Sequence, residues 1–178
     1  MKEVGVEIPK VNYTGKIREI AIGAGGGQVT VGGETMYPFH LFEGQMPHAP
    51  RIAMEVYDSP PEDWAEVALE PFGEVVNDPV AWAQRCIQDY GAEMICLQLA
   101  STDPNGRNRP AEEAAAVAKK VADVIHVPLI VWGCANDDKD AETLRRVAEL
   151  CQGKSLVIGP VVERPAALVE AFVSLRSR

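Results

Sequence analysis

Four nearly unbroken apolar runs dominate the hydrophobic pattern of the chain. They cover residues 51–57, 94–100, 129–134 and 155–159. Short continuous runs of this kind, rather than strict alternation with charges, are typical of parallel strands that are covered on both faces. We therefore expect four parallel strands in the second part of the chain.

Helical signals fill the gaps between these runs. Asp78 and Pro79 supply a cap and a first-turn proline, and Gly91 supplies a stop. The apolar stripe expected between them is Val80, Ala83, Ile87 and Tyr90.

Three further helices are expected along the chain. One begins at Pro110 and is predicted to turn Val117, Val121 and Val124 inward. Another begins near residues 137–140, with acidic residues in its first turn, and ends before Gly153. A last one starts around Pro165.

The region before the first strand has a different pattern. Residues 17–22 and 28–31 alternate and flank the glycine-rich residues 23–27, which predicts a β-hairpin. A dinucleotide-binding loop would need a glycine where Gln28 stands and a helix where Val29, Thr30 and Val31 follow, so that alternative is disfavoured. We expect residues 1–50 to form this hairpin and a connector, and residues 51–178 to form the βα part.

Consecutive βα units with short links imply right-handed crossovers and a parallel sheet. Two α/β architectures fit the pattern. One is an open doubly wound sheet, and the other is the first half of an eight-stranded β/α barrel, which usually takes about 250 residues. Periodicity alone does not choose between them.

Charge and composition narrow the classes of partner. A net charge of -9 and a pI near 4.8 disfavour nucleic acid and anionic membrane surfaces. The longest apolar stretch, residues 127–135, is about half of a spanning helix, and the N-terminus lacks the apolar block of a signal peptide. We expect a cytoplasmic protein. No two of the four cysteines have the two-residue spacing of a metal clamp, so we expect no iron–sulfur cluster in this chain.

Candidate site residues lie in the loops that follow the strands, because ligands of parallel α/β folds gather at the carboxyl ends of the strands. These loops are rich in short polar groups suited to an amide-bearing or pterin-like ligand. The same residue types also cap helices and build turns, and for Asp137 and Asp138 capping is the preferred role. The candidates for binding a cofactor are Asp58, Thr102, Asp103, Asn105, Asn136 and Asp138.

No catalytic nucleophile with its base is evident in these loops. The three histidines, His40, His48 and His126, all lie elsewhere, which disfavours a hydrolase or a metal-dependent enzyme. Proteins that ligate a corrinoid cobalt through histidine carry Asp-x-His-x-x-Gly, and Pro38 stands where His40 would need the aspartate. A corrinoid would therefore not be ligated by this chain in that way.

Several segments, in order, carry a family resemblance. They are VGGE (31–34), PFHLFEG (38–44), RIAMEV (51–56), PLIVWGCAN (128–136), DKDAE (138–142) and LVIGP (156–160). With these segments the chain resembles the small (delta) subunit of the corrinoid iron–sulfur protein of the CO dehydrogenase/acetyl-CoA synthase system, also called acetyl-CoA decarbonylase/synthase. The resemblance covers roughly residues 15–160, and several runs in order are more specific than any one of them.

The resemblance implies a TIM-type β/α barrel related to pterin-dependent methyltransferases. It also implies a larger partner subunit that carries an iron–sulfur cluster and a corrinoid (cobamide), which the small subunit helps to cover. In this one-carbon chemistry of the Wood–Ljungdahl pathway, a methyl group passes from a methyl-tetrahydropterin through the corrinoid to acetyl-CoA synthase. The expected partners are the large corrinoid subunit, acetyl-CoA synthase/CO dehydrogenase and a methyltransferase.

The chain departs from the family in length, since it ends after the fourth βα unit. We expect a partial (β/α)8 barrel of about four units preceded by a hairpin, either truncated or closed by another copy or another chain. The leading hypothesis is an assisting component of corrinoid-mediated methyl transfer without catalytic residues of its own. The alternatives are a pterin-binding methyltransferase, in which Asp103 and Asn136 bond the pterin, and a non-functional remnant.

Overall fold

The computed structural model describes residues 7–161 and divides the chain into two compact units. The first unit takes in the described residues up to Ala21 together with Thr30–Arg51. The second takes in Ile22–Val29 and the described residues from Ile52 onward. The division runs through the predicted hairpin, whose tip belongs to the second unit, and the domain boundary near residue 50 stays a prediction.

The predicted hairpin is confirmed, with shorter strands β1 (Ile20–Ile22) and β2 (Val29–Val31) around the 3-10 turn η1 (Gly25–Gly27). Glycines are required in its tip because the backbone passes very close to residues 126–128. A Cβ on Gly23 would lie 2.8 Å from Pro128 Cγ, and one on Gly27 would collide with the His126 carbonyl oxygen. These glycines therefore serve backbone packing.

In the first unit, the Glu43 carboxylate organises the connector. It accepts hydrogen bonds from the Tyr13 hydroxyl at 2.6 Å and from the Val11 amide at 3.1 Å, and lies 3.0 Å from His40 Nδ1. The hydrogen bond to Glu43 raises the pKa of Tyr13 to about 12. Polar contacts across about thirty residues of sequence thus give the connector a defined path.

The four predicted strands are confirmed in the second unit, and each is two residues shorter at one end than predicted. They are β3 (Ala53–Tyr57), β4 (Met94–Gln98), β5 (Leu129–Trp132) and β6 (Val157–Gly159). All neighbours are parallel, and the strand order β3-β4-β5-β6 follows the sequence. Ile95, for example, lies beside Met54 on one side and Leu129 on the other.

Three long helices lie where the sequence predicts them: α2 (Pro79–Gln88), α3 (Ala111–Val124) and α4 (Asp137–Leu150). Asp78 caps α2 by accepting the Val80 amide at 3.0 Å. Three short elements were not predicted, namely α1 (Glu66–Leu69), η2 (Gly73–Asn77) and η3 (Ala100–Thr102). The helix expected from Pro165 lies outside the described residues.

The inward faces of two helices differ from the predicted stripes. In α2 the fully buried side chains are Trp82, Ala83 and Cys86, whereas Tyr90, beyond the helix end, is 48% exposed. In α3 the alanines fill most of the buried face, and Val124 in the last turn is 46% exposed. The prediction was wrong at Tyr90 and Val124 because it followed large apolar residues, while close helix packing selects small ones.

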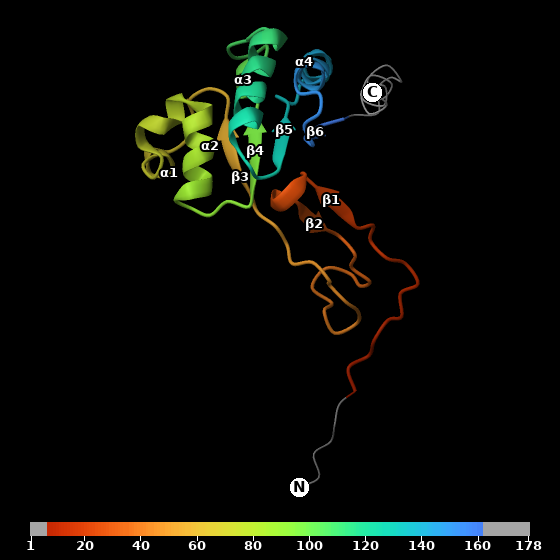
Figure 1. Cartoon of the computed structure of the whole chain (residues 1–178). Helices are drawn as coiled ribbons and strands as arrows, with labels where there is room; N and C mark the ends of the chain where they lie inside the picture. Colours follow the sequence, from red (N-terminus) through yellow and green to blue (C-terminus); the bar gives the residue numbers. More distant parts are fainter. Residues whose placement is uncertain (1–6, 162–178) are drawn as a thin grey trace. The chain divides into compact units, whose positions relative to one another are not determined.

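The two faces of the sheet are unlike. Val56, Ile95, Leu97 and Val131 are completely buried and share one core with residues of α2, α3 and α4. Figure 1 shows these helices following one another along the same side of the sheet, in the order of the strands. A doubly wound sheet would carry helices on both faces. Alternate residues point to the other face, which we call the open face: Glu55, Cys96, Gln98, Ile130, Trp132 and Val157.

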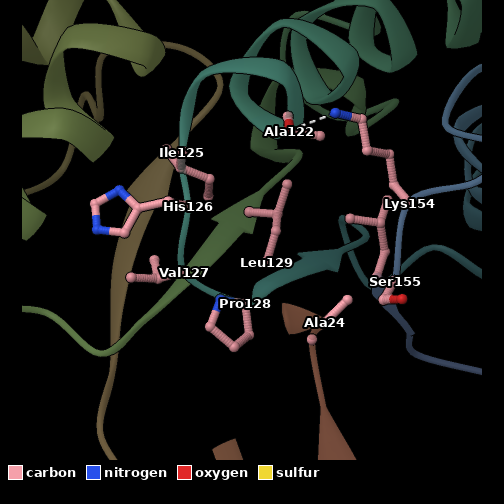
Figure 2. Close-up of a pocket in the computed structure, with 11 residues that line it drawn as sticks. Ala24, Ala122, Ile125, His126, Val127, Pro128, Leu129, Lys154 and Ser155 are labelled. Atoms are coloured by element: carbon pink, nitrogen blue, oxygen red, sulfur yellow. Dashed lines mark hydrogen bonds between the residues drawn. The ribbon is translucent and has the colours of Figure 1, made fainter. Parts of the chain in front are cut away.

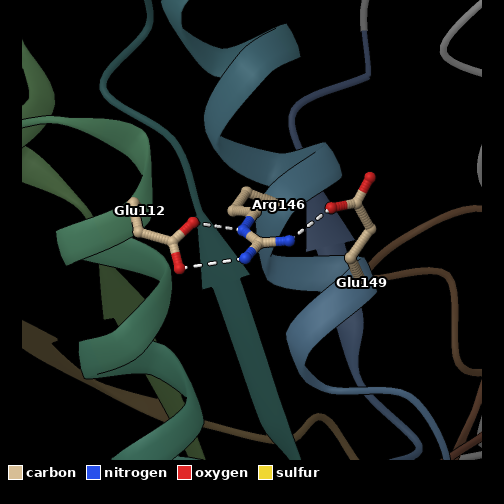
Figure 3. Close-up of polar contacts among 3 residues, drawn as sticks. All are labelled: Glu112, Arg146 and Glu149. Atoms are coloured by element: carbon tan, nitrogen blue, oxygen red, sulfur yellow. Dashed lines mark hydrogen bonds and ion pairs between the residues drawn. The ribbon is translucent and has the colours of Figure 1, made fainter.

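An ion-pair network joins α3 and α4 on the solvent side. Arg146 donates to both carboxylate oxygens of Glu112, with Nη2 at 3.0 Å from Oε1, and its Nη1 lies 2.8 Å from Glu149 Oε2 (Figure 3). The hydrogen bond to Arg146 lowers the pKa of Glu112 below its usual value. This two-point contact bridges the exposed sides of the two helices.

Candidate functional site

The carboxyl ends of the strands meet at one edge of the sheet, where Asp58 is one of two almost completely buried acids. Asp58 follows β3 and is 3% exposed. Its Oδ1 accepts the Ser101 amide at 2.9 Å, its Oδ2 accepts the Ser101 hydroxyl, and Arg109 Nη1 lies 3.5 Å from its carbonyl oxygen. Burial raises the pKa of the Asp58 carboxyl, and the Ser101 hydrogen bonds and the charge of Arg109 only partly offset it. Asp58 therefore locks the loop after β4 to the end of β3.

A second set of buried contacts joins the loops after β4 and β5 and involves Thr102, Cys134 and Asp140. Thr102 is fully buried, and its hydroxyl donates to the Leu99 carbonyl at 2.8 Å. Asp140 from the first turn of α4 is 3% exposed and accepts the amides of Cys134 at 2.7 Å and Ala135 at 3.0 Å. Burial raises the pKa of the Cys134 thiol, which also contacts Thr102 and Asp140. The loop after β5 is thus held from both sides.

The other predicted site residues are engaged locally. Asp103 Oδ1 accepts the Asn105 amide at 2.8 Å and its side-chain Nδ2 at 3.2 Å, which closes a turn. Asn136 caps α4 by accepting the Lys139 amide at 3.1 Å, and Asp138 is exposed in the first turn of that helix. The six predicted residues therefore share one edge, but Asp58 and Thr102 are buried within it, and Asn105 and Asp138 face solvent.

Sequence reasoning missed four side chains that shape this edge. Ser101 donates to Asp58, and Asp140 accepts the backbone amides of the loop after β5. Gln98 donates its amide to the Gly133 carbonyl, and the Trp132 ring lies across Gly159, where an added Cβ would be 2.8 Å from Cζ3. One available signal was Gly133, whose position has no room for a Cβ because the Asp140 carboxylate fills it. Trp132 lies at this edge on the open face and is 41% exposed, so its ring presents a large aromatic surface there.

A hollow of about 240 Å³ lies at the opposite, amino edge of the sheet (Figure 2). The Lys154 amine beside it donates to the Ala122 carbonyl at 3.2 Å and pairs with Asp123 at 3.0 Å, so the C-terminal end of α3 already engages this charge. The hollow contains none of the predicted site residues. Its lining is Gly23, Ala24, Ala122, Ile125, His126, Val127, Pro128, Leu129, Lys154, Ser155 and Leu156.

Two negative findings concern metal ligands and membrane-spanning helices. Within residues 7–161, no group of three or more histidine, cysteine or acidic side chains is arranged to hold a metal ion. In the same described part of the chain, no helix has the length and apolar character needed to cross a bilayer. All four cysteines are free, and Cys86 and Cys151 are buried.

Comparison with known proteins gives one consistent result. Residues 19–163 match the family described as CO dehydrogenase/acetyl-CoA synthase delta subunit. The chain is 36% identical over 156 residues to an acetyl-CoA decarbonylase/synthase complex subunit delta of Archaeoglobus fulgidus, covering 84% of this chain and 34% of the relative. The subunit delta of Methanopyrus kandleri is 33% identical, with 84% and 38% covered, and subunit delta 1 of Methanosarcina thermophila is 34% identical, with 82% and 35% covered. The chain spans about a third of the length of these relatives.

Proposed function

Because the chain belongs to the CO dehydrogenase/acetyl-CoA synthase delta subunit family, we propose that it assists corrinoid-mediated methyl transfer as a docking component. In this proposal its carboxyl edge packs over a corrinoid carried by a larger iron–sulfur subunit, in the cytoplasm. In such a complex, a methyl group would move from a methyl-tetrahydropterin to acetyl-CoA synthase by way of the corrinoid, which this chain would help to cover. The relatives are named as subunits of an acetyl-CoA decarbonylase/synthase complex, which supports a role within an assembly.

The observation that carries the proposal is that the buried polar side chains of the carboxyl edge are already hydrogen-bonded within the protein. The hydroxyls of Ser101 and Thr102 are buried and donate to groups inside the protein. The Cys134 thiol has a raised pKa, which disfavours the reactive thiolate. A rigid edge whose nucleophiles are already engaged suits the presentation of a surface better than covalent chemistry.

The side chains left at the surface of this edge fit a corrinoid in chemical terms. Asn105 and Asp138 are exposed polar groups that can meet amide side groups, and the exposed indole of Trp132 offers a flat apolar face. When bound, the corrinoid supplies the cobalt that carries the methyl group. The side chains of this chain would orient the corrinoid and exclude water from it.

We also propose that the second unit is half of a β/α barrel. Sequential parallel strand order with the helices along one face is the arrangement found in such barrels. The carboxyl edge would then be part of the barrel face where ligands of this fold gather.

Co-purification tests the proposal. The tagged chain is expressed with the large corrinoid subunit of such a complex, and both the subunit ratio and the cobamide absorbance of the product are measured. We expect a stoichiometric coloured complex. Asp138→Lys at the carboxyl edge should reduce the amount of co-purified corrinoid subunit at least tenfold. The matched control is Asp89→Lys at the end of α2 near the amino edge, and it should bind as the unchanged chain does. A folded chain that never associates with the corrinoid subunit would contradict the proposal.

The methyltransferase alternative makes a separate prediction. Asp103 and Asn136 already bond their own backbone, which gives both residues a structural role. If they also bind a pterin, the chain alone will bind a methyl-tetrahydropterin and lose this binding in Asp103→Ala. Absence of both pterin binding and complex formation would leave the remnant hypothesis.

A further inference from the structure

The turn after β5, residues 133–136, has a backbone that its residue types disfavour. Ala135 has a φ of 67°, in the left-handed region that residues with a Cβ rarely adopt. Gly133 has no room for a side chain, because an added Cβ would collide with the Asp140 carboxylate. Such conformations persist only where the surrounding structure imposes them, and they are frequent at binding sites. The turn therefore depends on a constraint from outside it.

That constraint is the carboxylate of Asp140. It accepts the amides of two successive residues, Cys134 at 2.7 Å and Ala135 at 3.0 Å, an arrangement that we call the carboxylate clamp. Asp140 is only 3% exposed, and a carboxylate is costly to bury unless it is well hydrogen-bonded. The start of α4 is already capped by Asn136, which accepts the Lys139 amide. Helix capping alone therefore does not explain a buried acid at position 140.

The carboxylate clamp also fixes the direction of a carbonyl group in the turn. The N–H and C=O of a trans peptide point in opposite directions, and the bond between Cys134 and Ala135 is trans. Because the Ala135 amide points to Asp140, the Cys134 carbonyl points away from it. The Gly133 carbonyl accepts the Gln98 side chain, whereas the Cys134 carbonyl accepts no hydrogen bond within the described part of the chain. Since Ala135 is exposed, the turn presents an acceptor oxygen at the carboxyl edge.

We propose that Asp140 is a positioning residue, which holds this turn so that the Cys134 carbonyl oxygen accepts an N–H from a carboxamide group of the ligand bound at the carboxyl edge. The inference rests on the proposed function and deepens it, because it names a point at which the chain recognises the amide side groups of the corrinoid. A carboxamide carries two N–H donors, and a carbonyl oxygen is a suitable acceptor for them. An acceptor that is held in place before binding loses little freedom on binding, which favours affinity.

The first test examines the carboxylate clamp in the chain alone, by hydrogen exchange. The amides of Cys134 and Ala135 should exchange slowly in the unchanged chain. Asp140→Asn replaces one acceptor oxygen by a donor, so at least one of the two amides should exchange faster, by about tenfold or more. The control is Asp137→Asn, which makes the same change of charge at an exposed position in the same helical turn and should leave both rates unchanged. Rapid exchange of both amides in the unchanged chain, or equal effects of the two variants, would overturn the inference.

The second test measures the ligand contact in the complex. The large corrinoid subunit is loaded either with its natural cobamide or with a derivative whose side-group carboxamides are methyl esters, which lack the N–H donors. The unchanged chain should bind the first form about tenfold more tightly. Asp140→Asn should lose this preference and bind both forms with the weaker affinity, whereas Asp137→Asn should keep it. Circular dichroism checks that each variant is folded.

The comparison of amide with ester uses the unchanged chain, so it decides even if Asp140→Asn does not fold. Equal affinities for the two forms would overturn the inference, and so would a preference that persists in folded Asp140→Asn.

These results are distinguishable from failure of the proposed function. A complex that forms equally well with both corrinoids, and that Asp140→Asn does not weaken, would overturn the inference and leave the proposed function standing. A folded chain that binds neither form of the corrinoid subunit would contradict the proposed function and overturn the ligand assignment with it, whatever hydrogen exchange shows of the carboxylate clamp.

Discussion

The covered and open faces of the same four strands differ in how far their side chains are buried. On the covered face, Ile95, Leu97 and Val131 are completely buried beneath helices. On the open face, their sequence neighbours Cys96, Gln98 and Ile130 are only partly buried. Since successive residues of a strand point to opposite faces, adjacent positions can have opposite roles. We therefore expect adjacent substitutions to differ in effect, and the predictions below test that difference.

The largest effect is expected from Leu97→Ala. This side chain is fully buried, and its truncation removes apolar contacts and leaves a cavity, so the free energy of unfolding should fall by about 3 kcal/mol. Cys96→Ala, one position earlier on the open face, should lower it by less than about 1 kcal/mol. Urea titration of both variants at one protein concentration measures the contrast. Equal losses would mean that the open face is as tightly packed as the covered one.

Variants of Asp58 test how much the hydrogen bonds between Asp58 and Ser101 contribute to the stability of the protein. Asp58→Ala leaves the Ser101 amide and hydroxyl without their acceptor and should lower the free energy of unfolding by about 2 kcal/mol. Asp58→Asn can still accept the Ser101 amide with its carbonyl oxygen and can donate its Nδ2 to the Ser101 hydroxyl, and it removes a buried charge, so at neutral pH it should be at least as stable as the unchanged chain.

The pH dependence of these Asp58 variants follows from the direction of the pKa shift. Burial raises the folded-state pKa of Asp58 above its unfolded value, so the folded state binds the proton more tightly. The unchanged chain should therefore lose stability relative to Asp58→Asn as pH rises from the unfolded pKa through the folded one, with a constant difference above that range. Thermal unfolding across acidic pH measures this trend, and the opposite slope would show that the Ser101 hydrogen bonds outweigh burial.

Local signals in the sequence were sufficient for the strands and the long helices but not for the carboxyl edge. Asp78 with Pro79 predicted the start of α2, and Gly91 predicted its end, because caps act within a few residues. Asp140 was recognised only as a first-turn acid. Its contacts with Cys134 and Ala135 depend on the path of the turn after β5. Likewise, Asp58 and Ser101 are 43 residues apart, and only the parallel pairing of β3 with β4 brings them together.

Periodicity could not show whether the helices cover one face of the sheet or both. Alternating βα units are compatible with helices on one face or on both, because the pattern of each strand is apolar in either case. Glu55 and Gln98 were the available hints, since they place polar groups at alternate positions of β3 and β4. Those two side chains lie on the open face, where helices are absent from the described second unit.

Glu55 tests whether the open face tolerates a change of charge. The carboxylate is exposed in the middle of β3. Glu55→Gln should therefore change the free energy of unfolding by less than about 0.5 kcal/mol, because substitutions of exposed side chains away from caps and buried networks have small effects. Urea titration measures the change. A larger loss would indicate that the carboxylate has a stabilising partner on the open face.

The smallest effect is expected on the solvent side of the helices, at Arg146. Arg146→Gln removes the ion pairs with Glu112 and Glu149, and exposed pairs of this kind contribute little. Its pairing lowers the pKa of Glu112, so any stabilisation is present above the unfolded pKa of that glutamate and is lost as pH falls. The variant should therefore show a slightly lower melting temperature at neutral pH and low salt, and none of this difference at acidic pH or about 1 M salt. Arg145→Gln, on an exposed neighbour with no ion pair in the described part of the chain, is the control. A large, salt-independent loss in Arg146→Gln would mean that the contact between α3 and α4, rather than the sheet beneath them, limits the stability of the covered side.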